Sequence, residues 1–94
     1  MKIPAKVKIG GVLYDVIHAN EWHESNDADG ETFYNKKQGN KIYIRDELSD
    51  EAKGITFIHE ALHAMNRTMN HEFLDSLSEQ LYQFLSDNDL LKEQ

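Results

Sequence analysis

The chain has 94 residues, a formal net charge of −7 and no cysteine. A chain of this length suits one small domain with a modest core, and the lack of cysteine excludes disulfides and thiolate metal ligands. Its few basic residues are diffuse, which argues against nucleic acid as a partner. No segment approaches the length of a membrane span, and the N-terminus lacks the apolar core of a signal peptide. We therefore expect a cytoplasmic protein with no membrane partner.

The chain is predicted to begin with a β-hairpin. Residues 7–18 form two β-rich runs around Gly10-Gly11, a dipeptide that suits a tight turn. Residues 20–30 then combine asparagine, aspartate, serine and glycine, which indicates a loop.

A second pair of strands is expected after this loop. Residues 31–35 are predicted to form a strand, followed by a turn at residues 36–40. Residues 41–45 alternate polar and apolar side chains, as a half-buried strand does. This last strand could be a sheet edge that receives an extended peptide as an added strand, or equally an interior strand. Together these segments predict a small antiparallel sheet of three or four strands.

The second half of the chain is predicted to form two helices. Ser49 or Asp50 can cap the first helix, which runs to about residue 67. Its apolar stripe comprises Ile55, Ile58, Ala61, Leu62, Ala64 and Met65. The stripe of the second helix comprises Leu74, Leu77, Leu81, Phe84 and Leu85. We therefore expect an α+β fold in which a small sheet packs on two helices.

The predicted organisation is a single domain spanning the whole chain. Its parts are a mainly β-sheet region over residues 1–48, a motif-bearing helix over 49–67 and a second helix over 70–88.

Residues 59–63 read H-E-x-x-H within the first helix. His59 and His63 project from one face of the helix a turn apart, so both imidazoles can reach a single ion. Glu60 can reach a water on that ion and serve as general base. The pattern is short and can occur by chance on a surface helix, but its place beside an apolar stripe favours a site for one zinc ion.

A catalytic zinc site needs three protein ligands and an exchangeable water, so a third ligand must follow His63. The candidates on the second helix are His71, Glu72, Asp75 and Glu79. On a helical wheel, His71 lies with Asp75 at the edge of the apolar stripe, whereas Glu72 lies nearer the solvated side. This geometry favours His71, with Glu72 as the rival.

A strand followed by the H-E-x-x-H helix and a second helix resembles the gluzincin group of zincin metallopeptidases and their small ImmA/IrrE-like, often phage-encoded, relatives. The likeness covers roughly the C-terminal half. It implies a glutamate ligand on the second helix, an acidic or amide residue four positions later and a small residue three positions after that. His71, Asp75 and Ser78 have this spacing, so this chain carries histidine where the group usually has glutamate; a shift of one residue would restore Glu72. The resemblance also implies that Asp75 accepts the free ring N–H of a ligand histidine, in the first place His59, while an ordinary solvated carboxylate on the helix surface is the alternative.

Other side chains are weaker candidates for a functional role. His18 and His23 do not have ligand spacing and are interpreted as ordinary polar residues. Trp22 could cover the core or line a substrate groove, and core cover is the preferred interpretation. A hydroxyl for a tetrahedral oxyanion could come from Tyr34, Tyr43 or Tyr82, among which the sequence does not choose.

The motif and its setting predict a zinc metalloprotease, a hydrolase that cleaves a protein or peptide substrate with Glu60 as general base. A catalytically inactive zinc-binding domain that recognises a partner protein is the alternative, since the chain is small and the third ligand departs from the family pattern. A purely structural domain with ordinary histidines is a third, weaker interpretation.

Overall fold

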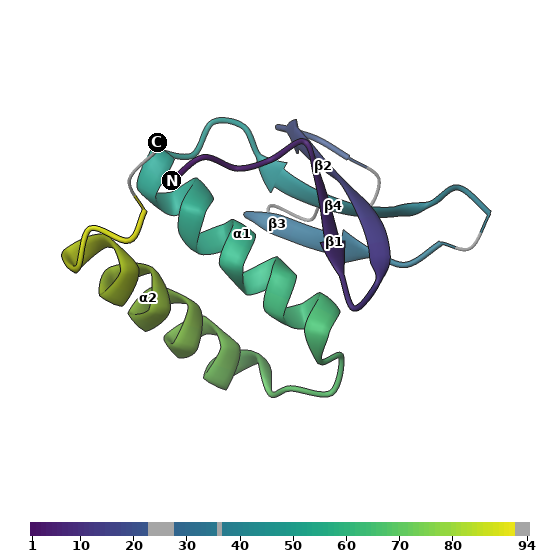
Figure 1. Ribbon diagram of the computed structural model, residues 1–94. Helices are drawn as coiled ribbons and strands as arrows, with labels where there is room; N and C mark the ends of the chain where they lie inside the picture. Colours follow the sequence, from purple (N-terminus) through teal and green to yellow (C-terminus); the bar gives the residue numbers. More distant parts are fainter. Residues whose placement is uncertain (23–27, 36, 92–94) are drawn as a thin grey trace.

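The computed structural model describes residues 1–22, 28–35 and 37–91. Its elements follow the predicted order: β1 (Lys6–Ile9), β2 (Val12–Ala19), β3 (Gly30–Phe33), β4 (Asn40–Arg45), α1 (Asp50–Met65) and α2 (His71–Asp87). They form three layers, with α1 lying between the sheet and α2 (Figure 1). The α+β prediction is therefore confirmed, although α2 packs on α1 rather than directly on the sheet.

The four strands form one mixed sheet in the order β1-β2-β4-β3. The β1–β2 hairpin turns at Gly10 and Gly11, which both have positive φ, as the sequence predicted. The β3–β4 pair is also antiparallel, but β2 and β4 are parallel, so the prediction of an all-antiparallel sheet is wrong in this pair. The reason is that the chain crosses from β2 to the far edge of the sheet before it turns back through β3 into β4.

β4 is an interior strand, so its interpretation as a peptide-accepting edge is wrong. It pairs with β2 on one side and β3 on the other, and Ile42 and Ile44 are fully buried. β3 is instead the edge strand on this side of the sheet, and it lies against α1.

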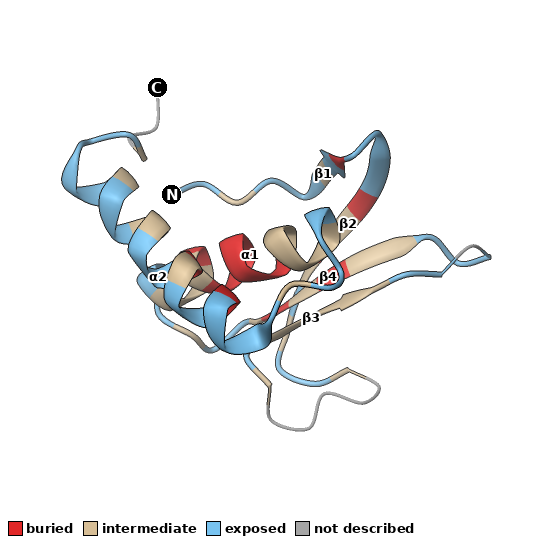
Figure 2. Cartoon of the chain, turned by 90° about the horizontal axis from the view of Figure 1, so that it is seen from below, coloured by how far each residue is buried: buried red, intermediate tan, exposed pale blue. Residues whose placement is uncertain are grey.

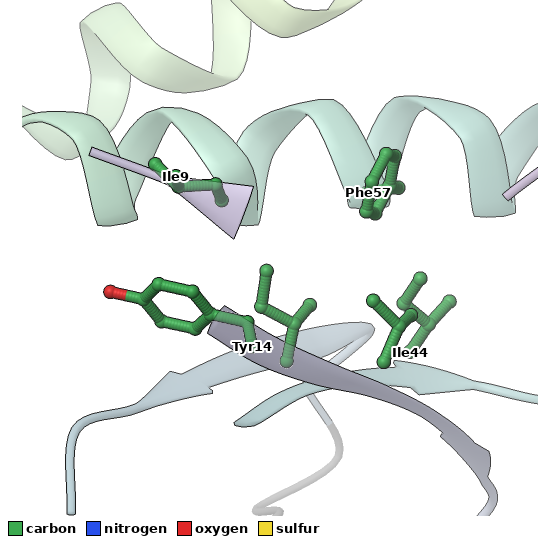
Figure 3. Packing of buried hydrophobic residues seen from close by; sticks show 6 residues of the cluster. Ile9, Tyr14, Ile44 and Phe57 are labelled. Atoms are coloured by element: carbon green, nitrogen blue, oxygen red, sulfur yellow. The ribbon is translucent and has the colours of Figure 1, made fainter. Parts of the chain in front are cut away.

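The core lies between the sheet and α1, where Phe57 points toward the strands (Figure 3). Its buried cluster consists of Ile9, Tyr14, Val16, Ile42, Ile44 and Phe57. Figure 2 shows the same concentration of buried residues on α1 and on the strands beneath it. Burial of a large side chain such as Phe57 contributes about 1.5–3 kcal/mol to the free energy of unfolding. Phe57 was not among the residues predicted for the apolar stripe of this helix. Met65, expected in the buried stripe, is 64% exposed because it lies in the last turn of α1.

Capping residues set the ends of both helices. The Ser49 hydroxyl accepts a 3.1 Å hydrogen bond from the backbone N–H of Ala52, which fixes the start of α1 as predicted. α1 ends at Met65, two residues before the predicted end, and the N–H of Asn66 caps it. Asn70 caps α2 by accepting a 3.1 Å hydrogen bond from the N–H of Phe73.

α2 packs closely on α1 through small residues. Ser78, the small residue in the spacing His71, Asp75 and Ser78, is buried, and its hydroxyl donates to the carbonyl of Leu74 at 2.7 Å. On α1, a Cβ atom added to Gly54 would lie 2.5 Å from Cε2 of Tyr82. Phe84, expected in the packing stripe of α2, is instead exposed. No helix in the described part of the chain has the length and apolar character needed to cross a membrane.

Candidate metal centre

Three histidines meet where α1 faces the start of α2. The ring centroid of His59 lies 4.7 Å from that of His63 and 4.9 Å from that of His71, and the His63 and His71 centroids are 5.3 Å apart. One nitrogen from each ring lies within 4.8 Å of the others, so the three form a group that could hold one metal ion. The structure thus brings together the three histidines that the sequence singled out.

The group combines different degrees of burial. His59 is buried, His63 is half-buried and His71 is exposed. His71 reaches the group because it is the first residue of α2, directly after the cap at Asn70. The rival residue Glu72 is exposed and lies outside the group. The geometry therefore favours His71, while its role as a ligand stays a prediction.

The environment of His59 and His63 favours the neutral form of both rings. Burial lowers the pKa of His59, His63 lowers it further, and the nearby carboxylate of Asp75 acts in the opposite direction. Burial also lowers the pKa of His63, with a second contribution from His71. A neutral imidazole is the form that binds metal, so the donor set suits an ion at neutral pH.

Asp75 lies beside the histidine that the sequence analysis assigned to it. Its Oδ1 is 3.1 Å from Nδ1 of His59 and 3.9 Å from Nε2 of His71. An Nδ1–H facing a carboxylate leaves Nε2 of the same ring available as a donor toward a metal. The Asp75 side chain is 57% exposed, so it meets the group from the solvent side.

Glu60 is buried next to the histidines, with an exposed fraction of only 6%. Its Oε1 accepts a 2.7 Å hydrogen bond from the hydroxyl of Thr32, and its Oε2 lies 4.0 Å from Nε2 of His59. Burial raises its pKa from about 4.5 to about 7, even though the Thr32 hydrogen bond acts to lower it. The carboxyl group thus has one oxygen held by β3 and the other near the histidines.

Thr32 can reach Glu60 because β3 approaches α1 closely at Gly30. A Cβ atom at Gly30 would lie 2.5 Å from Cγ2 of Thr56 and 2.8 Å from the carbonyl oxygen of Tyr43. Gly30 and Thr32 are two positions apart on β3 and so face the same side of the strand. The role of Thr32 was not predicted from the sequence. The available signal was the pair of small residues at positions 30 and 32, which share one side of a predicted strand and permit a close approach to another element.

Two cavities open beside the histidine group. The first, of about 310 Å³, is lined by both helices and by residues 28–30; at the cluster it contacts His59, Glu60 and His71. The second, of about 260 Å³, is lined by β3, Tyr34, Arg67 and the side of the cluster that carries His63. Glu60 and His71 line both cavities, so the group can be approached from two sides.

Of the three tyrosines considered for an oxyanion, Tyr34 is the one among the described residues that line these two cavities. Its hydroxyl donates to the backbone carbonyl of His63 at 3.1 Å. Tyr43 lies on the sheet face opposite Ile42 and Ile44, because side chains alternate along β4. Tyr82 packs against Gly54 between the helices.

The remaining candidates lie away from the cluster or outside the described residues. Trp22 stacks on Tyr43 with ring centroids 5.2 Å apart and donates from Nε1 to Glu31 at 3.2 Å, so it covers the outer sheet face. His18 is exposed on β2 and does not belong to the histidine group. His23 lies outside the described residues.

Comparisons of the chain with protein-family models, with curated proteins and with solved structures found no match. Three imidazoles within reach of one ion, a buried carboxyl group with a raised pKa and two adjoining cavities provide donors, a proton acceptor and access for a ligand.

Proposed function

We propose that this protein is a zinc metallopeptidase of the gluzincin-like kind that the H-E-x-x-H motif resembles. The observation that carries the proposal is the meeting of His59, His63 and His71 beside the buried carboxyl group of Glu60. A metal-binding helix motif alone is a short pattern, but a third donor from another helix and a neighbouring base make a catalytic arrangement.

His59, His63 and His71 would hold the ion through neutral imidazole nitrogens. The fit rests on the donor chemistry: one nitrogen per ring lies within 4.8 Å of the others, and the pKa values of His59 and His63 are lowered. Zinc bound there supplies Lewis acidity and lowers the pKa of a coordinated water to about 7. Three protein donors leave the fourth position for exchange, as a catalytic site requires.

Glu60 is the general base of the proposed reaction. Its Oε1 is held by Thr32, so Oε2, on the side of His59, takes the proton from the attacking water. The same carboxyl group then returns the proton to the leaving amine when the peptide bond breaks. In the metal-free protein burial raises the pKa of Glu60 to about 7. The positive charge of a bound zinc ion would lower this pKa and favour the carboxylate form that accepts the proton.

β3 provides the surface against which we expect a peptide to lie. It is an edge strand, and Gly30, Glu31 and Thr32 line the second cavity together with the histidine side of α1. An extended peptide can pair with such an edge through main-chain hydrogen bonds, which do not depend on the peptide sequence. This arrangement favours an unfolded or extended segment of protein as the substrate.

Metal content and turnover test the proposal together. The native protein should contain about one zinc per chain by elemental mass spectrometry, and a His59→Ala, His63→Ala double variant should contain none. A His18→Ala variant is the matched control, because this histidine is exposed and lies outside the group.

The reconstituted protein should cleave a fluorescently labelled unfolded protein, and Glu60→Gln should abolish cleavage while keeping zinc. Cleavage that survives in Glu60→Gln would overturn the mechanism. Stable zinc binding without any turnover would instead support an inactive zinc-binding domain that recognises a partner protein.

A further inference from the structure

Arg67 lies at the wall of the second cavity, in the turn that joins the two helices. Its guanidinium carbon lies over the ring of Tyr34, 3.5 Å from the centroid, in a cation–π contact. The guanidinium also interacts with the Tyr34 hydroxyl, where it acts to lower the pKa. Tyr34 is in turn tied to α1, because its hydroxyl donates to the carbonyl of His63 at 3.1 Å. These contacts hold the Arg67 side chain beside the histidine group.

The charge of Arg67 has no ionic partner within the described residues. No carboxylate of residues 1–22, 28–35 and 37–91 lies within ion-pair distance of it. The two carboxyl groups that share its cavity have other partners: Glu31 accepts from the indole of Trp22, and Glu60 accepts from Thr32. A guanidinium has five N–H donors, so the contacts of Arg67 with Tyr34 leave other N–H groups able to donate.

The two cavities differ in the charged side chains that line them. Among the described residues that line the first cavity, the charged ones other than histidines are all acidic: Asp29, Glu60, Asp75 and Glu79. Arg67 is the one cation other than histidine among the described residues that line either cavity, in a chain with a net charge of −7. A negatively charged group that approaches the histidines therefore meets a cationic donor on the Arg67 side, next to the carboxyl groups of Glu31 and Glu60, and meets none among the described residues of the first cavity other than histidines.

We propose that Arg67 binds a carboxylate of the substrate, so that the protein selects peptides with an aspartate or glutamate close to the scissile bond. The inference rests on the proposed function, since it names the substrate class of the same site. A guanidinium fork matches a carboxylate with two parallel hydrogen bonds, and such charge-assisted pairs are the strongest hydrogen bonds in proteins. The cavity of about 260 Å³ offers room for one such side chain next to Glu60 and His63.

Peptide binding to a zinc-loaded Glu60→Gln protein tests the proposed role of Arg67, because this variant should bind substrate without cleaving it. The probes are fluorescent octapeptides of alanine and leucine that carry a single glutamate at each position in turn, and the same series with glutamine. Fluorescence anisotropy should show at least one position at which glutamate binds about tenfold more tightly than glutamine, as expected for a hydrogen-bonded charge pair. Arg67→Gln should abolish this difference.

Two further variants separate a specific contact from general charge. Arg67→Glu should reverse the preference, so that a peptide with lysine at the same position binds better than one with glutamate. Lys8→Gln removes one positive charge from an exposed position on β1, far along the chain from the cavity, and should leave the preference for glutamate unchanged. Circular dichroism of each variant confirms that it is folded.

The result can overturn this inference separately from the peptidase proposal. Binding with no glutamate preference at any position, no binding of any glutamate peptide, or a preference that persists in Arg67→Gln would each refute the role of Arg67. An Arg67-dependent preference in Glu60→Gln, together with no cleavage by the zinc-loaded wild-type protein, would uphold the carboxylate site and refute the peptidase.

Discussion

The hydroxyl of Thr32 donates a 2.7 Å hydrogen bond to Oε1 of Glu60, which links the edge strand β3 to α1 at the candidate base. The same hydroxyl lies 3.2 Å from the backbone carbonyl of Glu60. One carboxyl oxygen is thereby fixed, and the other lies on the side of His59. The strand that would hold the peptide thus also sets the orientation of the group that would take the proton.

Replacing Thr32 with valine should slow peptide hydrolysis without removing the metal. Valine keeps the shape of the side chain but cannot donate, so Oε2 of Glu60 is no longer held toward His59. We expect kcat to fall about tenfold or more, the usual effect of losing a hydrogen bond to a charged group, with KM and zinc content little changed. Thr32→Ser retains the hydroxyl and should keep most of the activity; equal losses in the serine and valine variants would contradict the orienting role.

The choice between His71 and Glu72 can be decided by paired substitution. His71→Ala should weaken zinc binding by more than the ~10–100-fold that follows loss of a hydrogen-bonding partner of a ligand, because a donor itself is removed. Glu72→Ala should leave the affinity unchanged, since this side chain is exposed and outside the histidine group. Competition with a chromogenic chelator measures both affinities. The assignment is wrong if the alanine at position 72 is the one that loses zinc.

Asp75 should strengthen zinc binding through His59 rather than by direct contact. Its Oδ1 lies 3.1 Å from Nδ1 of that ring, which fixes the ring orientation and makes Nε2 a better donor. Asp75→Ala should therefore reduce zinc affinity about 10–100-fold. Glu79→Ala is the matched control, because Glu79 lines the same cavity but makes no ion pair with a histidine among the described residues. Equal affinities of the two variants would refute the role.

The features that could be predicted from the sequence are local ones. The hairpin at Gly10-Gly11 and the start of α1 at Ser49 depend on residues close along the chain. The pairing of His59 with His63 follows from the helical repeat alone. Such features need no knowledge of how the elements pack.

The features that could not be predicted depend on contacts between distant segments. The parallel pairing of β2 with β4 is decided by the path of the chain across the sheet, which alternation of polar and apolar residues does not encode. Thr32 and Arg67 reach the site only because β3 and the interhelical turn converge on α1. His71 and Glu72 are neighbours in sequence and lie about 100° apart around a helix. A helical wheel could therefore favour one of them as the third ligand, but it could not show that either side chain reaches His59 and His63.

The raised pKa of Glu60 predicts how the stability of the metal-free protein changes with pH. Burial raises this pKa from about 4.5 to about 7, so the folded state binds the proton more tightly than the unfolded chain. The resulting stabilisation is fully present below pH 4.5 and is lost as the pH rises through about 7. Its upper limit is about 3 kcal/mol, at 1.36 kcal/mol per pKa unit. His59 and His63 act in the opposite sense, because their lowered pKa values cost stability as the pH falls.

Glu60→Gln separates the contribution of the carboxyl group from that of the histidines, which both proteins share. Glutamine resembles the protonated carboxyl group at every pH, so the wild type should lose stability relative to the variant as the pH rises from 5 to 8. Urea denaturation of the two metal-free proteins at both pH values gives this difference in the free energy of unfolding. We expect it to change by about 1–3 kcal/mol in favour of the variant. A difference that stays constant across this range would show that the carboxyl group titrates near its ordinary pKa and is not buried as the structure shows.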